Sequence, residues 1–414
     1  MPYRGRLADA YLADLLTELP AVLLTGARAT GKTTSAVRLA AEVVRLDEPG
    51  RAASYRADPD AALRRAARPV LLDEWQEVPE VLGAVKRAVD ADSAPGQFLL
   101  TGSVRAVLRT QTWAGTGRVV RVPLYGMTRR EIDGQLDRDS FLDRLARSGL
   151  DELTVPPEPP VLHDYVAMMF QSGFPELTVP DRSARYRRVW TTGYLDDLVT
   201  RDAAALGAPR DPVRLRAYLA ALALSAAGTV HDTTLAAAAG INVRTVQAYD
   251  DLLHDLYVTQ SVPAWPTSAN RFAAMAKAAK RYVVDPALAA AAATLEAGDV
   301  LDTPDLLGRF FDSFAVAQLR PEAALREPPA RLMHLRTHGG RQEIDLIADL
   351  GRGRVVALEM KAAAPVDRSD ARHLLALRDA LGDRFLAGAV LHSGPGLYTL
   401  ADRVHAVPLC AVWT

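Results

Sequence analysis

The sequence predicts an α/β protein in which a parallel sheet with helices on both faces precedes a mainly helical segment and a smaller second α/β segment. A phosphate-binding loop motif lies between an apolar run and a helical pattern near the N-terminus. Further apolar runs alternate with helical patterns as far as residue 124, which is typical of a parallel sheet. Helical patterns then dominate until about residue 299, where strands and helices are mixed again.

Length and composition set the limits for these segments. At 414 residues, with 49% hydrophobic and 24% charged residues, the chain is globular and too long for one core. The net charge of −1 gives no overall attraction to nucleic acid or membrane, so such binding would depend on local patches. The single Cys410 excludes disulfides and a cysteine-based zinc site. Without a signal sequence or an apolar run long enough for a membrane span, a cytoplasmic protein is expected.

The first motif fits the pattern of a nucleotide-binding P-loop. Residues 1–20 are expected to form an amphipathic helix, 21–25 a buried strand and 34–44 a helix. Between strand and helix, backbone N–H groups would face phosphate oxygens, Lys32 would reach the β- and γ-phosphates, and Thr33 would hold Mg²⁺. The alternative is a glycine-rich turn that binds nothing. The candidate binding residues are Gly26, Ala27, Arg28, Ala29, Thr30, Gly31, Lys32, Thr33 and Thr34.

The second half of a nucleotide-hydrolysis site is predicted at the end of a strand over residues 69–74. Asp73 would hold the Mg²⁺ through water, and Glu74 would orient and deprotonate the attacking water. Doubly wound sheets bind ligands at the carboxyl ends of their strands, which is where both carboxylates lie. The alternative is a strand that simply ends in polar residues.

Strands are also expected at residues 43–46, 97–103 and 118–124. Ser103, or alternatively Thr101, is placed to sense the γ-phosphate or to position water, although either could equally cap the strand end. Arg118 is a candidate charge-stabilising arginine, in cis or toward a neighbour, and a solvated surface arginine is the alternative.

Short motifs after the P-loop carry a resemblance to a known family. In order they are Leu46-Asp47-Glu48-Pro49, Asp58-Pro59, residues 72–80 (LDEWQEVPE) and Leu100-Thr101-Gly102-Ser103. The chain resembles the prokaryotic AAA-type ATPases in which the ATPase core precedes a C-terminal domain of unknown function. The resemblance implies that Lys32, Thr33, Asp73 and Glu74 form an ATP site and that Ser103 is the sensor. Trp75 occupies a position that is usually hydrophobic in the family, and the usual second sensor motif is not marked.

A proline-rich stretch at residues 149–163 predicts a domain boundary. The expected domains are an ATPase domain at 1–150, a helical winged-helix-like domain at 160–298 and an α/β domain at 299–414. The turn at 173–176 (GFPE) also resembles the family. A basic stretch near Tyr186 and Trp190 would form either a DNA-facing helix or a solvated helix packed against the ATPase; it comprises Arg182, Arg185, Arg187, Arg188 and Arg201.

Residues 232–262 predict a helix-turn-helix followed by a strand, the outline of a winged helix. The second helix, 243–257, should turn Val246, Tyr249, Leu253 and Leu256 inward. Its outward residues are Arg244, Gln247, Asp250, Asp251 and Asp255, and the three carboxylates are unfavourable for phosphate contact. The pattern therefore favours the fold more than DNA binding. A more basic patch on the wing side is expected from Arg271, Lys277, Lys280 and Arg281.

The last segment predicts a helix at 304–320, strands at 342–348 and 354–361, a helix at 370–381 and strands near 385–392 and 405–413. Asp345 on one strand and Glu359-x-Lys361 on the next resemble the core of restriction-endonuclease-like nucleases, and Asp312 would complete the site. The carboxylates would hold Mg²⁺ or Mn²⁺, and the lysine would activate water. An active nuclease, an inactive metal- or DNA-binding domain and a structural domain all remain open.

Three hypotheses for function follow. The first is an Mg²⁺-dependent ATPase that binds ATP and whose nucleotide state controls a C-terminal region that binds nucleic acid or a partner. The second is a metal-dependent DNA nuclease or DNA-processing effector that is powered or gated by ATP. The third is a nucleotide-switched module that binds a protein partner with little turnover. Stimulation of ATP turnover by DNA would distinguish the first two from the third.

Overall fold

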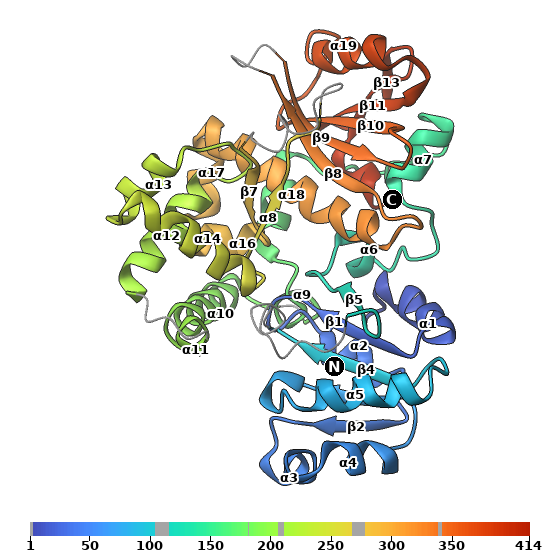
Figure 1. Ribbon diagram of the computed structural model, residues 1–414. Helices are drawn as coiled ribbons and strands as arrows, with labels where there is room; N and C mark the ends of the chain where they lie inside the picture. The colour runs from blue at the N-terminus through green and yellow to red at the C-terminus, as the bar shows by residue number, and fades with distance from the viewer. Residues whose placement is uncertain (1–2, 104–115, 181, 206–210, 267–277, 338–341) are drawn as a thin grey trace.

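The computed structural model describes the whole chain apart from residues 1–2, 104–115, 181, 206–210, 267–277 and 338–341. A parallel sheet with its helices forms one end of the molecule, and a second, mixed sheet forms the other (Figure 1). Helices of the middle segment lie at the side of both (Figure 1). The predicted α/β class, with a parallel sheet, a helical region and a small mixed-sheet domain, is confirmed.

The first region is built around five parallel strands in the order β2-β3-β4-β1-β5. Because all the pairings are parallel, the carboxyl ends of the five strands meet at one edge. Its elements are α1 (Ala8–Glu18), β1 (Ala21–Thr25), α2 (Lys32–Val37), β2 (Glu42–Arg45), α3 (Pro49–Ala57), α4 (Pro59–Arg65), β3 (Val70–Asp73), η1 (Trp75–Glu77), α5 (Val81–Ala91), β4 (Phe98–Gly102) and β5 (Val120–Pro123).

Successive side chains of β1 point to opposite faces of the sheet, and each face is covered by helices. Val22 and Leu24 pack in one cluster with Leu12 of α1 and Ala36 of α2. Leu23 packs in the other cluster, to which α3, α4 and α5 contribute. Both faces are therefore dry, which explains why β1 is apolar at every position rather than alternating.

One predicted helix is too long. Residues 34–44 are expected to be helical, but α2 ends at Val37. The reason lies in the sheet, because Glu42 pairs with Val70 and Arg45 with Asp73. Pairing of β2 with β3 requires an extended chain from residue 42 onward, so the tertiary context overrides the local helical pattern.

In its described residues the middle region is mainly helical, with one antiparallel strand pair, β6 with β7. The expected helix-turn-helix is present as α13 and α14, followed by β6. The elements are α8 (Leu162–Gln171), α9 (Pro175–Thr178), α10 (Ala184–Asp197), η3 (Leu198–Asp202), α11 (Ala203–Ala205), α12 (Pro212–Leu224), α13 (Asp232–Ala239), α14 (Val243–Asp255), β6 (Thr259–Val262), β7 (Lys280–Val283), α16 (Pro286–Ala292) and α17 (Ala297–Asp302).

The C-terminal region is a six-stranded mixed sheet in the order β12-β13-β11-β10-β9-β8. Helix α18 covers one face with Phe311 and Phe314, and α19 covers the other with Leu374 and Leu377. The elements are α18 (Pro304–Leu325), β8 (Arg331–Arg336), β9 (Glu343–Asp349), β10 (Val355–Lys361), α19 (Arg372–Leu381), η5 (Gly382–Arg384), β11 (Phe385–His392), β12 (Tyr398–Ala401), β13 (Val404–Pro408) and η6 (Leu409–Val412). The strand expected at 405–413 is therefore wrong beyond Pro408, where the chain turns into a short buried helix.

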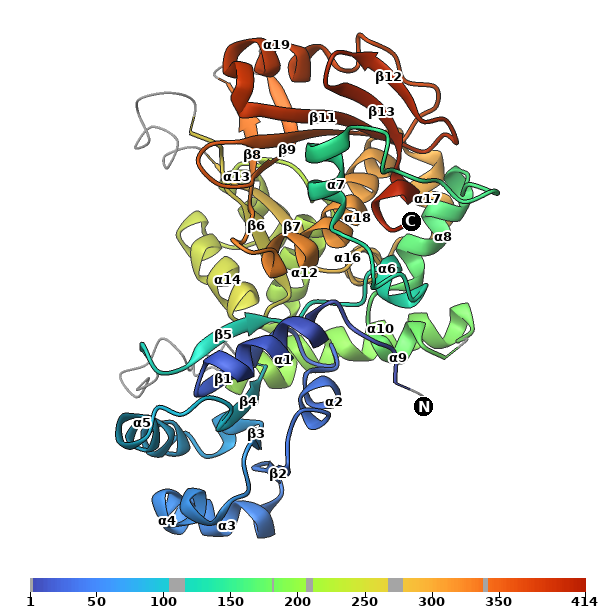
Figure 2. The same cartoon turned by 90° about the vertical axis from the view of Figure 1, so that its right-hand side faces the viewer.

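The first region is fastened to α18 through two short helices, α6 (Arg129–Ile132) and α7 (Phe141–Ser148). Figure 2 shows α7 beside β11 and α6 below α18. The backbone N–H of Arg129 donates to Gln318 Oε1 at 2.7 Å, and Arg130 Nη1 donates to Glu322 Oε1 at 2.6 Å. None of the helices in the described ranges is long and apolar enough to cross a membrane.

These contacts generate a stability prediction for Glu322→Ala. The Glu322 carboxylate is buried and also accepts the Phe141 N–H at 2.9 Å, so its loss leaves the Arg130 guanidinium buried without its counter-charge. We expect the free energy of unfolding to fall by about 3–5 kcal/mol in urea titrations followed by circular dichroism. The control is Glu343→Ala, which removes a half-exposed carboxylate 4.0 Å from Arg336 and should cost less than about 1 kcal/mol. An equal loss of unfolding free energy in the two variants would contradict the role of Glu322 as the buried counter-charge of Arg130.

Candidate nucleotide site and C-terminal carboxylate cluster

The P-loop connects β1 to α2 with the geometry that its glycines require. Gly26 and Gly31 have φ values of 150° and 92°, which side chains rarely adopt. A Cβ atom on Gly26 would lie 2.2 Å from the carbonyl oxygen of Leu124, so no other residue fits there. The loop thus wraps tightly and delivers Lys32 at the first position of α2.

Lys32 is folded back into the loop. Its Nζ donates to the carbonyl oxygens of Gly26 at 3.0 Å and Ala27 at 2.7 Å, and its side chain is buried. Burial lowers the pKa of Lys32 to about 8, against the opposing effects of the Glu74 and Asp73 carboxylates. The ammonium group is the cation that the phosphates of a nucleotide in this loop would meet. Thr34, also part of the motif, is exposed on α2.

Asp73 lies at the carboxyl end of β3 and collects two hydroxyl groups. Thr33 Oγ1 donates to Asp73 Oδ1 at 2.7 Å, and Thr101 Oγ1 donates to the same oxygen. Thr101 comes from the neighbouring strand β4, so the sheet register brings it there. Of the two sensor candidates, Thr101 is therefore the one that contacts Asp73. Ser103 is 2% exposed, and its Oγ has no hydrogen-bond partner among the described residues.

Glu74 follows Asp73 in a left-handed conformation with φ of 52°. Its N–H donates to Thr101 Oγ1 at 3.3 Å, and the side-chain amide of Gln76 donates to Glu74 Oε2. Trp75 is buried against the end of β4, where a Cβ atom on Gly102 would lie 2.6 Å from its Nε1. The tryptophan at this usually hydrophobic position of the family pattern is therefore accommodated by the adjacent glycine.

Arg118 is not at this site in its own chain. It precedes β5, whose Pro123 pairs with Thr25, so it lies at the opposite end of the sheet from the P-loop. There its Nε pairs with Asp90 Oδ1 at 2.7 Å. The structure does not bring it to Lys32, because parallel strands separate the residues that precede them from those that follow them.

Two side chains outside the motifs hold the P-loop. Arg6 is buried, and its Nη1 donates to the carbonyl oxygen of Thr30 at 2.8 Å. Arg28 Nε pairs with Asp202 Oδ2 of η3 at 3.1 Å. Nothing in the sequence near Arg6 or Asp202 marks them as partners of the P-loop, since both are remote from it along the chain.

The GFPE turn of the middle region also reaches the loop. A Cβ atom on Gly31 would lie 3.6 Å from Pro175 Cγ. The Gly173 carbonyl oxygen accepts the Met127 N–H at 2.6 Å, which fixes the turn beside β5. Helix α10 follows, with Trp190 and Tyr194 packed on Phe174. The predicted basic stretch is partly neutralised, because Arg182, just before α10, pairs with Glu176, and Arg188 on α10 pairs with Glu296.

In the C-terminal region the three predicted carboxyl groups come together. Asp312 lies on α18, Asp345 on β9 and Glu359 on β10, and all three are mostly buried. Asp345 Oδ2 accepts the Met360 N–H at 3.0 Å, and Asp345 also shares a hydrogen bond with Glu359. Lys361 is half-exposed, and among the described residues no hydrogen bond or ion pair joins it to the three carboxyl groups.

A lysine that was expected elsewhere enters this cluster. Lys280 Nζ lies 3.1 Å from Asp312 Oδ2 and 2.8 Å from Asp345 Oδ1. Burial raises the pKa of Asp312 to about 6 despite the nearby ammonium group. Although burial alone would raise it, Lys280 and hydrogen bonds lower the pKa of Asp345 to about 2. Across the described part of the chain, no group of three or more His, Cys, Asp or Glu side chains is arranged to hold a metal ion.

The predicted wing-side basic patch is therefore wrong in its described members. Lys280 is buried, and Arg281 bridges Asp232 Oδ1 at 2.8 Å and Asp250 Oδ2 at 2.9 Å. Neighbouring side chains of β7 point to opposite faces. Lys280 therefore reaches the C-terminal carboxylate cluster, and Arg281 reaches the helix-turn-helix. Arg271 and Lys277 lie outside the described residues.

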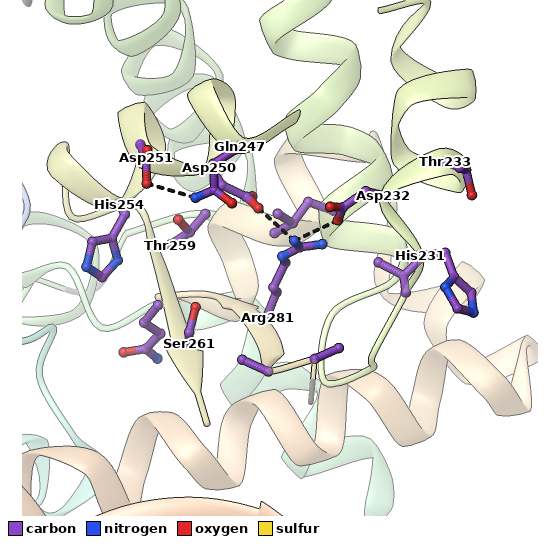
Figure 3. Close-up of a pocket in the computed structure, with 15 residues that line it drawn as sticks. His231, Asp232, Thr233, Gln247, Asp250, Asp251, His254, Thr259, Ser261 and Arg281 are labelled. Carbon is purple, nitrogen blue, oxygen red and sulfur yellow. Dashed lines mark hydrogen bonds and ion pairs between the residues drawn. The ribbon is translucent and has the colours of Figure 1, made fainter. Parts of the chain in front are cut away.

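Figure 3 shows the cavity into which Arg281 points, between α13, α14 and the β6–β7 pair. Its volume is about 790 Å³, and Asp232, Asp250 and Asp251 are in its wall. Gln247 donates to Asp251 Oδ1 at 3.0 Å. The expected inward residues of α14 are all buried, namely Val246, Tyr249, Leu253 and Leu256. Of the polar residues expected to face outward from α14, Gln247 bonds to Asp251 and Asp250 pairs with Arg281. The expectation is wrong for Asp255, which is buried.

Comparison with known protein families gives matches to three segments of the chain. Residues 18–133 match an AAA domain, residues 162–299 match a domain of unknown function (DUF8612), and residues 307–412 match a domain of unknown function (DUF4143). The AAA match contains β1 to β5 with Lys32, Asp73 and Glu74.

Two curated relatives are similar along nearly the whole chain. An uncharacterized protein of Mycobacterium tuberculosis and one of Mycobacterium bovis are each 28% identical over 413 residues, covering 98% of this chain and 84% of the relative. Among solved structures, the Walker-type ATPase of Pyrococcus abyssi matches 69% of this chain and 94% of its own at 15% identity, with a TM-score of 0.41. The family matches show that the chain carries an AAA domain followed by a C-terminal domain of unknown function, and this part of the predicted resemblance is confirmed.

Proposed function

We propose that this protein is an Mg²⁺-dependent ATPase whose nucleotide state is transmitted to its middle and C-terminal regions. The observation that carries the proposal is the meeting of Lys32, Thr33, Asp73 and Glu74 at the carboxyl edge of one parallel sheet, within a region that matches an AAA domain. Phosphoryl transfer depends mainly on positioning and on neutralising charge, and these four side chains supply both.

The residues at this edge fit a magnesium ion. Thr33 Oγ1 and Asp73 Oδ1 lie 2.7 Å apart and offer the hydroxyl and carboxylate oxygens that Mg²⁺ prefers. When bound, the ion would neutralise charge on the β- and γ-phosphates. Thr101 holds the Asp73 carboxylate in place from the neighbouring strand.

The chain's own side chains divide the remaining tasks. Lys32 supplies positive charge inside the loop, where burial strengthens its field. Glu74 is the general base in this proposal, and Gln76 orients its carboxylate. Ser103 contributes a buried hydroxyl beyond the end of β4, suited to a γ-phosphate or the attacking water.

A first route for transmission runs behind the P-loop. Arg6 binds the loop carbonyl of Thr30 and also pairs with Glu131 Oε1 at 3.0 Å. Glu131 closes the capping box that begins α6. On α6, Arg129 and Arg130 also bond to α18. A movement of the P-loop would therefore displace α18, the helix that carries Asp312.

A second route lies in front of the loop, where η3 and the GFPE turn approach it. Arg28 is held by Asp202 at 3.1 Å, and Pro175 packs beside Gly31. Phosphates bound to the loop would draw the Arg28 guanidinium toward them and compete with Asp202 for it. Nucleotide binding would thus shift the balance between two arrangements of the middle region.

The acidic wall of the helix-turn-helix cavity favours a protein partner over DNA for the responding region. Asp232, Asp250 and Asp251 would repel phosphates, and Arg281 is already engaged by two of them. A nucleotide-switched protein-binding module with slow turnover is therefore the second candidate. Stimulation of ATP turnover by single- or double-stranded DNA would contradict this preference, whereas no stimulation by either form would support it.

The ATPase proposal predicts different defects at Lys32 and Glu74. Lys32→Ala should abolish ATP binding because the loop loses its cation, whereas Glu74→Gln should retain ATP affinity and lose turnover by about 10²–10⁴-fold. The measurements are titration with a fluorescent ATP analogue and steady-state phosphate release. Lys86→Ala is the matched control, since this exposed lysine on α5 pairs only with Asp90 among the described residues. Normal turnover in the Glu74 variant would rule out its role as base.

Transmission predicts a pattern in amide hydrogen exchange. A non-hydrolysable ATP analogue should slow exchange in α6, α10 and the second half of α18. The Tyr194 hydroxyl of α10 donates to the Arg28 carbonyl oxygen of the P-loop at 3.5 Å, and α6 bonds to α18. Helix α19 covers the far face of the C-terminal sheet and serves as the internal reference. Lys32→Ala should show none of these changes. A response confined to the parallel sheet and its loops would contradict the proposed transmission.

A further inference from the structure

The cluster of Asp312, Asp345 and Glu359 already contains a cation. Lys280 Nζ lies 3.1 Å and 2.8 Å from one oxygen of each aspartate, and its side chain is only 3% exposed. Tyr282, two residues further along β7, donates its hydroxyl to Asp312 Oδ1 at 3.1 Å. One strand of the middle region therefore inserts two side chains into a site built from α18, β9 and β10.

The β6–β7 pair holds Lys280 in this place from its backbone. Lys280 pairs with Val262 on β6, and the chain after β6 continues along the edge of the C-terminal sheet. There the N–H of His334 on β8 donates to the Pro263 carbonyl oxygen at 2.9 Å, and the Trp265 N–H donates to the His334 carbonyl oxygen at 2.6 Å. The backbone of Lys280 is thus held by β6, and the chain that follows β6 is bonded to β8. The position of the ammonium group therefore depends on strand pairing as well as on the side chain.

The cluster does not fit a divalent metal while Lys280 is seated. Metal ions such as Mg²⁺ and Ca²⁺ bind carboxylate oxygens at roughly 2.0–2.6 Å and need about six oxygen ligands. The oxygens that face each other across the cluster are bonded to the ammonium group, and a second cation beside it would be strongly repelled. Glu359 is 4% exposed, and its Oε1 has no hydrogen-bond partner among the described residues, so the cluster retains unused oxygen capacity.

We propose that Lys280 is the resident cation of this cluster, that it excludes Mg²⁺ and Mn²⁺, and that it locks β7 to the C-terminal domain. Two buried carboxylates without a cation would repel each other, so the ammonium group stabilises α18 against β9 where a nuclease would use a metal. The C-terminal domain then serves as a platform to which the middle region is fixed. This inference does not depend on the ATPase proposal.

The test is Mn²⁺ binding to the nucleotide-free full-length protein, measured by electron paramagnetic resonance. Wild type and Asp345→Asn should bind Mn²⁺ equally, because the cluster takes no metal in either. Lys280→Met keeps the length of the side chain and removes its charge, and it should bind Mn²⁺ at one additional site, at least about tenfold tighter than any site in the wild type. Adding Asp345→Asn to Lys280→Met should remove that site. Lys361→Met, the matched control at the half-exposed lysine, should gain nothing.

A second measurement is the thermal stability of the same variants. Mn²⁺ should raise the melting temperature of Lys280→Met, which has two uncompensated carboxylates, and leave that of the wild type unchanged. An Asp345-dependent Mn²⁺ site in the wild type would overturn the proposal, as would a folded Lys280→Met protein that gains no site. If circular dichroism shows that Lys280→Met does not fold, the comparison of wild type with Asp345→Asn decides alone.

Discussion

The buried pair of Arg6 and Glu131 is the contact on which the nucleotide loop and the domain junction both depend. Glu131 Oε1 accepts Arg6 Nε at 3.0 Å and the Leu7 N–H at 2.8 Å, while Oε2 accepts the Thr128 N–H at 2.7 Å. Arg6 gives its other donors to the carbonyl oxygens of Thr30 and Tyr125. A buried ion pair gains little net stability unless its remaining hydrogen-bonding capacity is met, and here most of it is. Its effect is to define one arrangement of the N-terminus, the P-loop and α6.

Helix α18 extends this arrangement across the molecule. Its C-terminal half is bonded to α6 through Gln318 and Glu322, and its N-terminal half carries Asp312 against Lys280. On the same helix, Phe311 and Phe314 belong to a core that includes side chains of both the middle and C-terminal regions. Helix α18 packs with all three regions. The division into three domains expected from the proline-rich stretch therefore stays a prediction.

Local patterns predicted the parts of the fold that depend on local physics. The full P-loop pattern between an apolar run and a helical pattern predicted the loop, and an apolar run ending in Asp73 and Glu74 predicted both carboxylates at the carboxyl end of a strand. The helix-turn-helix was readable from the inward periodicity of α14. The length of α2 was not, because its end is set by the pairing of β2 with β3.

Charged residues were harder to place than apolar ones. Lys280 and Arg281 were expected on one basic surface, although period-two alternation puts neighbouring residues of a strand on opposite faces. The partners of each face of β7 could not be predicted, because they are distant along the chain. Lys280 meets Asp312 and Asp345, and Arg281 meets Asp232 and Asp250. Arg6 was missed for the same reason. Arg118 is a different case, because the predicted strand 118–124 begins at this residue, and the amino end of a parallel strand lies away from the P-loop.

The position of Lys280 bears on how the ATPase region and the C-terminal region can be related. If the ammonium group stays in the carboxylate cluster, movement of α6 reaches α18 as a rigid element and is passed to the middle region through β7. If a movement withdrew β7, two buried carboxylates would be left without a counter-charge, an arrangement that is costly in a buried site. The cluster therefore resists separation of the two regions, and the changes that follow nucleotide binding should appear where the contacts are weaker. Those contacts are the pair of the half-exposed Arg28 with the buried Asp202, and two exposed pairs along α10, Arg188 with Glu296 and Asp196 with Arg216.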